Sequence, residues 1–178
     1  MASILNVDKI RRAAGNTDAL VIDSGDRVTT PTRPFFRVSM VGTGGTGVSG
    51  HIIFNTVDTN QGSHWDATNG YFVAPVAGVY QFNFVSLQAD STSGSSINSG
   101  SDAECGIEVS TDSGSSYTRI GYSYTYCSNT FYYIPMNISV AVLLGAGNYV
   151  RVNFNEEYMY YNTVASGRAA HFSGYLVG

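Results

Sequence analysis

The sequence predicts an all-β protein, an antiparallel two-sheet jelly-roll sandwich preceded by an extended N-terminal arm. Two observations carry this prediction. From Phe35 onward, apolar and polar residues alternate in many short runs, and glycine, serine, threonine and asparagine separate these runs. No segment has the apolar spacing of three and four residues that marks a helix. Many short alternating strands with this spacing are typical of a sandwich or jelly roll.

The predicted strands follow one another from Phe35 to the end of the chain. Asn69-Gly70 is a signal for a tight hairpin turn, and the glycine-rich stretch 42–50 is expected to be a loop. Residues 156–168 are also expected to be a loop, because the alternation ends before them. The predicted strands are 35–41, 51–57, 71–74, 78–88, 103–111, 116–126, 131–144, 149–155 and 169–177.

The last strand has two apolar faces. Phe172 and Leu176 fall on one face, and His171 and Tyr175 fall on the other. Since neither face suits water, one face is expected to pack within the domain and the other against a second subunit. The long run 78–88 adds another aromatic face. We therefore expect the core or a subunit interface to contain Tyr80, Phe82, Phe84, Phe172, Tyr175 and Leu176.

Composition narrows the class of protein. A chain of 178 residues is long enough for one domain with a real core. Charged residues make up only 12 %, which suits a surface that copies or partners cover. The net charge of −4 gives no basic footprint for nucleic acid. No apolar run approaches the roughly 20 residues of a membrane span, so we expect no membrane insertion.

Three blocks of the sequence together resemble one known family. They lie at 53–82, 141–150 and 172–177, and the similarity covers about Phe35 to Gly178. The chain resembles the globular heads of complement component one-q, which are tumour necrosis factor-like jelly rolls. The resemblance implies a homotrimer about a threefold axis, with the closing strand and 78–88 near that axis. This sequence departs from the family at Ala74, where a cysteine is common, and in a long serine-rich insert at 90–102.

Residues 1–34 differ from the rest of the chain because they contain no aromatic residue. Two short apolar pieces, 4–7 and 19–22, are separated from the jelly roll by a linker between Pro31 and Pro34. Such an arm has no core of its own and is expected to dock on a larger body by adding strands. The attachment candidates are Ile4, Leu5, Val7, Arg11, Arg12, Leu20 and Ile22.

The first residues carry a second resemblance. Met1 to Ile10, Ala14-Gly-Asn16 and the Asp23-Ser-Gly turn are similar to the start of fibre and appendage proteins of tailed bacteriophages. This resemblance implies a structural and adhesive virion protein, made in the bacterial host cytoplasm. It would be a trimeric fibre tip, a capsid decoration or a knob that displays the head to a host receptor or glycan. The alternative is a soluble bacterial lectin-like or ligand-binding head outside any virion.

The sequence contains no catalytic constellation, so we expect no enzyme. An enzyme such as a glycan depolymerase would need carboxylates clustered in one cleft. The stretch 42–47 matches G-x-G-x-x-G, but a strand rather than a helix is predicted after it, so it is expected to be only a loop. His51, His64 and His171 lack zinc spacing. We expect no cofactor, and Asp102 with Glu104 is the pair that would contribute to a calcium site.

Two clusters of tyrosines and two cysteines are further candidates for contact or packing. The alternate tyrosines of 122–126 share one strand face and are expected to pack over the sheet. For Tyr158, Tyr160 and Tyr161, receptor contact and packing stay equally open, and they are our receptor-contact candidates. Cys105 and Cys127 are expected to be reduced, with a bridge between neighbouring strands as the alternative.

Overall fold

The computed structural model describes residues 7–11, 18–42, 46–89, 97–161 and 170–177. Every regular element among them is a β-strand, and the strand pairs are antiparallel. No helix in these ranges is long and apolar enough to cross a membrane.

The first layer of the head is a five-stranded sheet in the order β12-β9-β14-β4-β6. β9 and β12 pair without a register shift from Gly78↔Leu144 to Gln88↔Ile134. The closing strand β14 lies between β9 and β4, in the middle of the layer. The strands are β4 (Phe35–Met40), β6 (Thr56–Gln61), β9 (Gly78–Ala89), β12 (Ile134–Leu144) and β14 (Ala170–Leu176).

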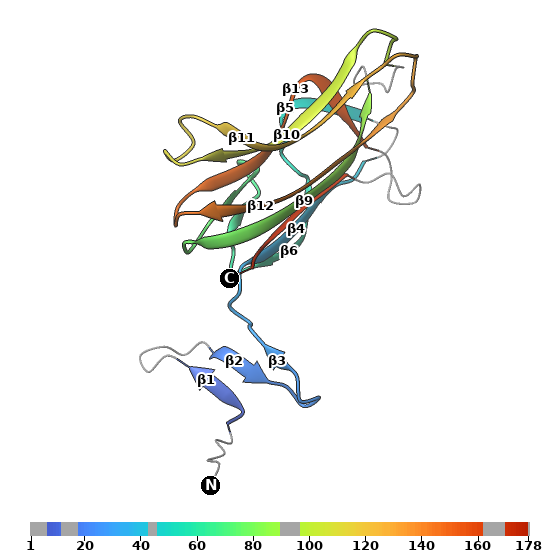
Figure 1. The fold of residues 1–178 in the computed structure, drawn as a ribbon. Helices are drawn as coiled ribbons and strands as arrows, with labels where there is room; N and C mark the ends of the chain where they lie inside the picture. The colour runs from blue at the N-terminus through green and yellow to red at the C-terminus, as the bar shows by residue number, and fades with distance from the viewer. Residues whose placement is uncertain (1–6, 12–17, 43–45, 90–96, 162–169, 178) are drawn as a thin grey trace.

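The second layer runs β11-β10-β13, and β13 also pairs with β5 and β8. The two layers join where Tyr158 to Tyr160 of β13 pair with the end of β9. This arrangement confirms the predicted antiparallel two-layer jelly roll (Figure 1). The strands are β5 (Thr46–His51), β7 (Trp65–Asp66), β8 (Tyr71–Val73), β10 (Asp102–Ser110), β11 (Thr118–Tyr126) and β13 (Tyr149–Tyr161).

Aromatic rings fill the space between the layers. The Phe36 ring lies 5.0 Å from the Trp65 ring and 5.1 Å from the Phe172 ring, measured between centroids. Phe82 stacks on Phe172 at 5.9 Å. Gly174 makes this packing possible, because a Cβ there would lie 2.5 Å from the Phe82 ring and 2.7 Å from the Phe36 ring. Any larger residue at position 174 would have to displace two buried rings.

The chain between positions 42 and 57 differs from the prediction. The predicted loop 42–50 contains the start of β5, and the predicted strand 51–57 is two strands, because β5 ends at His51 and β6 begins at Thr56. β5 pairs with β13 in the second layer, whereas β6 pairs with β4 in the first. Residues 52–55 therefore cross between layers. Their burial still alternates with period two, and this pattern alone cannot reveal the change of partner.

The prediction that strand β13 ends at 155 is also wrong. β13 continues to Tyr161, with a register shift between Phe154 and Met159. β13 pairs with β10 up to Asn153 and with β9 from Tyr158 onward, and it pairs with β5 on both sides of the shift. Glu156 and Glu157 interrupt the apolar–polar alternation at this point, so the pattern does not predict that the strand continues.

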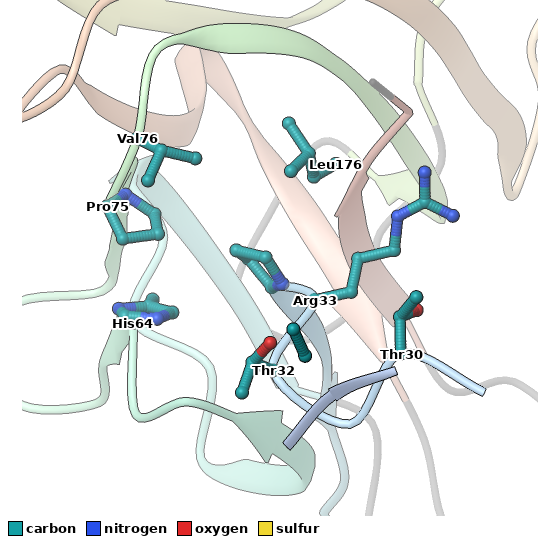
Figure 2. Close-up of a pocket in the computed structure, with 9 residues that line it drawn as sticks. Thr30, Thr32, Arg33, His64, Pro75, Val76 and Leu176 are labelled. Atoms are coloured by element: carbon teal, nitrogen blue, oxygen red, sulfur yellow. The ribbon is translucent and has the colours of Figure 1, made fainter. Parts of the chain in front are cut away.

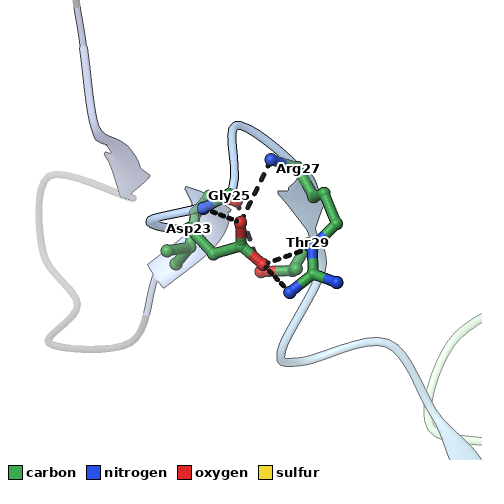
Figure 3. Close-up of polar contacts among 5 residues, drawn as sticks. Asp23, Gly25, Arg27 and Thr29 are labelled. Carbon is green, nitrogen blue, oxygen red and sulfur yellow. Dashed lines mark hydrogen bonds and ion pairs between the residues drawn. The ribbon is translucent and has the colours of Figure 1, made fainter.

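The predicted extended arm is a small sheet of its own. β1 (Lys9–Arg11), β2 (Asp18–Ile22) and β3 (Val28–Thr29) pair in this order, and residues 30–34 join them to the head (Figure 1). The predicted turn after β2 is present. Figure 3 shows that Asp23 accepts hydrogen bonds from the Gly25 and Arg27 backbone amides, at 2.9 and 3.1 Å, and pairs with the Arg27 guanidinium. These bonds, chiefly that from the Arg27 side chain, lower the pKa of Asp23.

Candidate functional site

The outward face of β11 is a row of exposed tyrosines. Tyr122, Tyr124 and Tyr126 alternate along this edge strand, and 67, 49 and 60 % of their surfaces are exposed. The prediction that these residues pack over the sheet is wrong. The alternation was read correctly, but the three side chains point away from the other layer, and nothing in the described head covers them. The row therefore offers rigid apolar rings with polar tips to a partner.

Carboxylates of the neighbouring strand lie beside this row. Asp102 is opposite Tyr126, and Glu104 is opposite Tyr124. The Tyr124 hydroxyl donates to Asp102 Oδ1 at 2.7 Å, and this hydrogen bond raises the pKa of Tyr124. Glu104 is paired with the Arg119 guanidinium. The predicted calcium pair is thus engaged in two separate contacts, and no group of three or more acidic, histidine or cysteine side chains gathers among the described residues.

A glycine lets Arg119 lie across the sheet. A Cβ at Gly106 would lie 2.6 Å from Arg119 Nε and 3.0 Å from its Cδ. Gly106 stands opposite Tyr122 in the strand pair, so the arginine stem occupies the space that a side chain would take. The guanidinium then reaches Glu104 on the same strand as Gly106. The sequence signal for this arrangement is a single glycine inside an alternating strand, which marks a close approach.

A second ion pair lies further along the same sheet. Arg151 Nε donates to Glu108 Oε2 at 2.9 Å, and Asn153 Nδ2 donates to Glu108 Oε1 at 3.2 Å. Arg151 Cζ also lies 3.4 Å from the centroid of the Tyr117 ring, in cation–π contact. Only 8 % of Glu108 is exposed. These contacts hold the side chains of the face in fixed positions before any partner arrives. We call the outward side of β11, β10 and β13 the tyrosine face.

The outward face of the first layer is different in kind. The strands β9, β12 and β14 contain no Asp, Glu, Lys or Arg at any position. Apolar side chains are exposed along it, with 38 % of Val79, 47 % of Val85, 74 % of Leu143 and 39 % of Tyr175 open. We call the outward side of these three strands the neutral face.

The few polar groups of the neutral face bond to one another. Gln81 Nε2 donates to Ser139 Oγ at 3.0 Å, and Ser139 Oγ donates to Asn83 Oδ1 at 2.9 Å. Pairing within the subunit means that a second subunit could cover these groups without leaving each one unbonded. The face is therefore suited to burial.

Most of the predicted core or interface candidates lie in the buried core, and one of them, Tyr175, lies on the neutral face. Tyr80, Phe82, Phe84 and Phe172 are fully buried inside one protomer, so they are core and cannot touch a second subunit. Leu176 is half-buried against the core, and Tyr175 is on the neutral face. The outward side chains of β9, which the sequence did not single out as interface candidates, are Val79, Gln81, Asn83 and Val85.

The receptor-contact tyrosines and the two cysteines contribute no further described surface to the candidate site. Tyr158, Tyr160 and Tyr161 lie in β13, and their side chains fall outside the described residues. Cys105 and Cys127 are both buried and carry thiols rather than a disulfide bridge. Burial raises the pKa of Cys105 to about 12, so its thiol is not a nucleophile at neutral pH.

A crevice of about 440 Å³ lies between the linker and the head (Figure 2). Arg33 donates to the Val177 carbonyl oxygen, and Gln61 Nε2 donates to the Pro31 carbonyl oxygen at 2.6 Å, which ties the linker to the head. Burial lowers the pKa of His64 at its edge. Among the described residues that line the crevice there is no carboxylate and no thiol. Its walls include Thr30, Thr32, Arg33, His64, Pro75 and Leu176.

Comparison with known families agrees with this two-layer head. The family model of the C1q domain matches residues 36–177, which is most of the chain. The chain belongs to the C1q family. C1q domains are trimeric globular heads that bind ligands or receptors, and they are binding or structural modules rather than enzymes.

A solved C1q structure shares the fold. The globular domain of zebrafish complement 1qA protein superposes with a TM-score of 0.55 at 16 % sequence identity. The similarity covers 82 % of this chain and 98 % of that one. Residues 1–35, which hold β1, β2 and β3, precede the part that the C1q family model matches.

Proposed function

We propose that this protein is a non-enzymatic, homotrimeric C1q head that binds its partner through the tyrosine face. The single observation that carries the proposal is the contrast between the two outward faces. One face is free of charged residues on three whole strands, and the other combines exposed tyrosines with fixed ion pairs. The first suits a subunit interface, and the second suits a ligand.

The neutral face supports the trimer. Burying a charge without a partner costs several kcal/mol, and this face has none to bury. Its exposed aliphatic side chains, such as Val79 and Leu143, would gain about 25 cal/mol for each Å² removed from water. The closing strand β14 contributes Tyr175 to the same surface.

The tyrosine face supports ligand contact, with a surface glycan as the ligand class. Tyr122 and Tyr126 present open rings, and Asp102 and Glu104 place hydrogen-bond acceptors beside them. Rings with polar neighbours can bind the apolar faces and the hydroxyls of sugars together. We expect no metal or cofactor in this contact.

Residues 1–34 are proposed to attach the head to a larger assembly, a tailed-phage virion. The support is the resemblance of Met1–Ile10 to phage appendage proteins. Within the described part, Leu20 and Ile22 lie in β2, Val7 precedes β1 and lines the hollow beside them, and Arg11 is paired with Asp18. Ile4, Leu5 and Arg12 fall outside the described residues. The second candidate is a free lectin-like head, which the same tyrosine face would serve.

Binding of the full-length protein to an array of bacterial surface polysaccharides tests the proposal. The double variant Tyr122→Ala/Tyr124→Ala should lose at least tenfold in affinity for any bound polysaccharide, because it removes two rings. The matched control Tyr122→Phe keeps the ring and should bind within about threefold of wild type. Equal binding by wild type and the double variant would move the contact elsewhere. Mass spectrometry of purified phage particles then separates the virion protein from the free head.

A further inference from the structure

The sheet formed by β1, β2 and β3, here called the arm sheet, has one apolar face. Residues directly opposite each other in an antiparallel pair project to the same side. The pairs Ile10↔Leu20 and Ile22↔Val28 therefore share one face. Together with Val7, and with Asp8 and Lys9 at its edge, they line a hollow of about 100 Å³.

The opposite face of the arm sheet holds its ion pairs. Lys9 is opposite Val21, and Val21 is opposite Thr29, so these three lie on the second face. Lys9 Nζ lies 3.0 Å from one oxygen of Asp18, and the Arg11 guanidinium lies 2.9 Å from the other. Lys9 and Arg11 are both paired with this carboxylate within the arm sheet, so we do not assign them a contact with an acidic partner.

The apolar face is open in the single chain. The exposed fractions are 50 % for Ile10, 41 % for Ile22 and 66 % for Val28. A sheet with strands of three, five and two residues buries too little apolar surface to be stable by itself. Something apolar must cover this face if the sheet is to persist.

The linker brings copies of this face together. Residues 30–34 span at most about 17 Å, and they are fixed to the head beside β14. The Leu176 amide donates to the Pro34 carbonyl oxygen at 3.2 Å, and Arg33 donates to the Val177 carbonyl oxygen. β14 is a strand of the neutral face, so trimer formation would hold three arm sheets within reach of one another. Short tethers of this kind give effective concentrations in the millimolar range.

We infer that the apolar faces of three arm sheets pack against one another about the threefold axis of the trimer. This inference rests on the trimer proposed above. Each copy provides the aliphatic surface that the others need, and the Asp18 carboxylate with its two cations lies on the second face. The attachment unit is then a threefold body, and Leu20 and Ile22 contact sister chains rather than the particle.

Cysteine cross-linking in the full-length protein tests this arrangement. Val28 and Thr29 are neighbours on β3 that project to opposite faces of the sheet. In purified Val28→Cys, a short bismaleimide should give several times more covalent dimer than in Thr29→Cys, the matched control. The native Cys105 and Cys127 are buried, and the wild-type protein measures any background from them.

Light scattering on the same samples separates the two ideas. A trimer with selective Val28→Cys cross-linking supports the inference. A trimer in which both variants cross-link equally, or neither does, overturns it and leaves the proposed head trimer intact. A wild-type monomer overturns the proposed trimer and this inference together.

Discussion

The tyrosine face and the neutral face belong to one sandwich and differ in the residues that alternation places outward. On the neutral face, β9, β12 and β14 carry no Asp, Glu, Lys or Arg, and burial lowers the pKa of their one histidine, His171. On the tyrosine face, β10 alone carries Asp102, Glu104 and Glu108. Both faces back onto the same aromatic core. The contrast therefore comes from outward residues that the fold does not require.

This contrast indicates what each face is for. A jelly roll needs apolar residues only on the inward side of each strand, so charge would be tolerated on either outward face. Its absence from three adjacent strands has no cost in a monomer and a clear benefit at a subunit interface. The paired charges of the other face remain stable in contact with water and a polar ligand.

The largest effect is expected from the core that both faces share. Phe82→Ala removes a fully buried ring that contacts Phe36, Phe72 and Phe172, and should cost about 3–5 kcal/mol of unfolding free energy. Phe131→Ala, a phenylalanine that is 42 % exposed, is the matched control and should cost under about 1 kcal/mol. Denaturant unfolding measures both variants. Similar losses would mean that the assignment of Phe82 to the core is wrong.

A smaller effect is expected within the tyrosine face. Glu108→Gln removes the charge that the half-buried Arg151 needs and should cost about 1–3 kcal/mol. Glu104→Gln, on the same strand and face, should cost less than about 1 kcal/mol because its carboxylate and Arg119 are more exposed to water. Thermal unfolding at low and high salt compares the two. A larger loss for Glu104→Gln would contradict the order of burial.

The smallest effect is expected from acidification. Burial lowers the pKa of His51, His64 and His171 below the ordinary value of 6.5, so the unfolded chain binds protons more readily than the native one. Stability should be constant above about pH 6.5 and fall as the pH drops from there towards 5. His51→Gln, which retains a donor for the Gly70 carbonyl oxygen, should reduce the difference in melting temperature between pH 7.5 and pH 5. A melting temperature that rises on acidification would contradict this sign.

The sequence predicted the sandwich and its core, because burial follows the period-two pattern directly. Tyr80, Phe82 and Phe84 are inward in β9, as their alternation required. The pattern could not say which layer a strand joins, so the crossing at 52–55 and the extension of β13 to Tyr161 were missed.

The candidate site was harder to predict, because an alternating pattern divides a strand into two sets of side chains without showing which set is buried. It groups Tyr122, Tyr124 and Tyr126 on one side but does not say whether that side is inward. Ile120 has the same parity as these tyrosines yet packs against the core, because the register shift between Ile107 and Glu108 changes the facing of β11 at that point. The ion pair of Arg119 and Glu104 joins two strands and depends on Gly106, which no linear spacing reveals.

The arm sheet was missed for a similar reason. Its strands are two to five residues long and contain no aromatic residue, so no propensity or periodicity marks them strongly. The apolar piece 19–22 and the turn at Asp23 were predicted from the sequence, whereas the pairing of β2 with β1 and β3 was not.

The most direct test of the two faces is the mass of the full-length protein in solution after a charge is placed on each. Val79→Asp puts a carboxylate on the neutral face, and Tyr122→Asp puts one on the tyrosine face, where 67 % of the side chain is exposed. Light scattering at low micromolar concentration should give three chains for wild type and Tyr122→Asp, and one folded chain for Val79→Asp, because the interface would otherwise bury a charge in each subunit. A Val79→Asp protein that stays trimeric, or a wild type that is monomeric, would show that the neutral face is not the subunit interface.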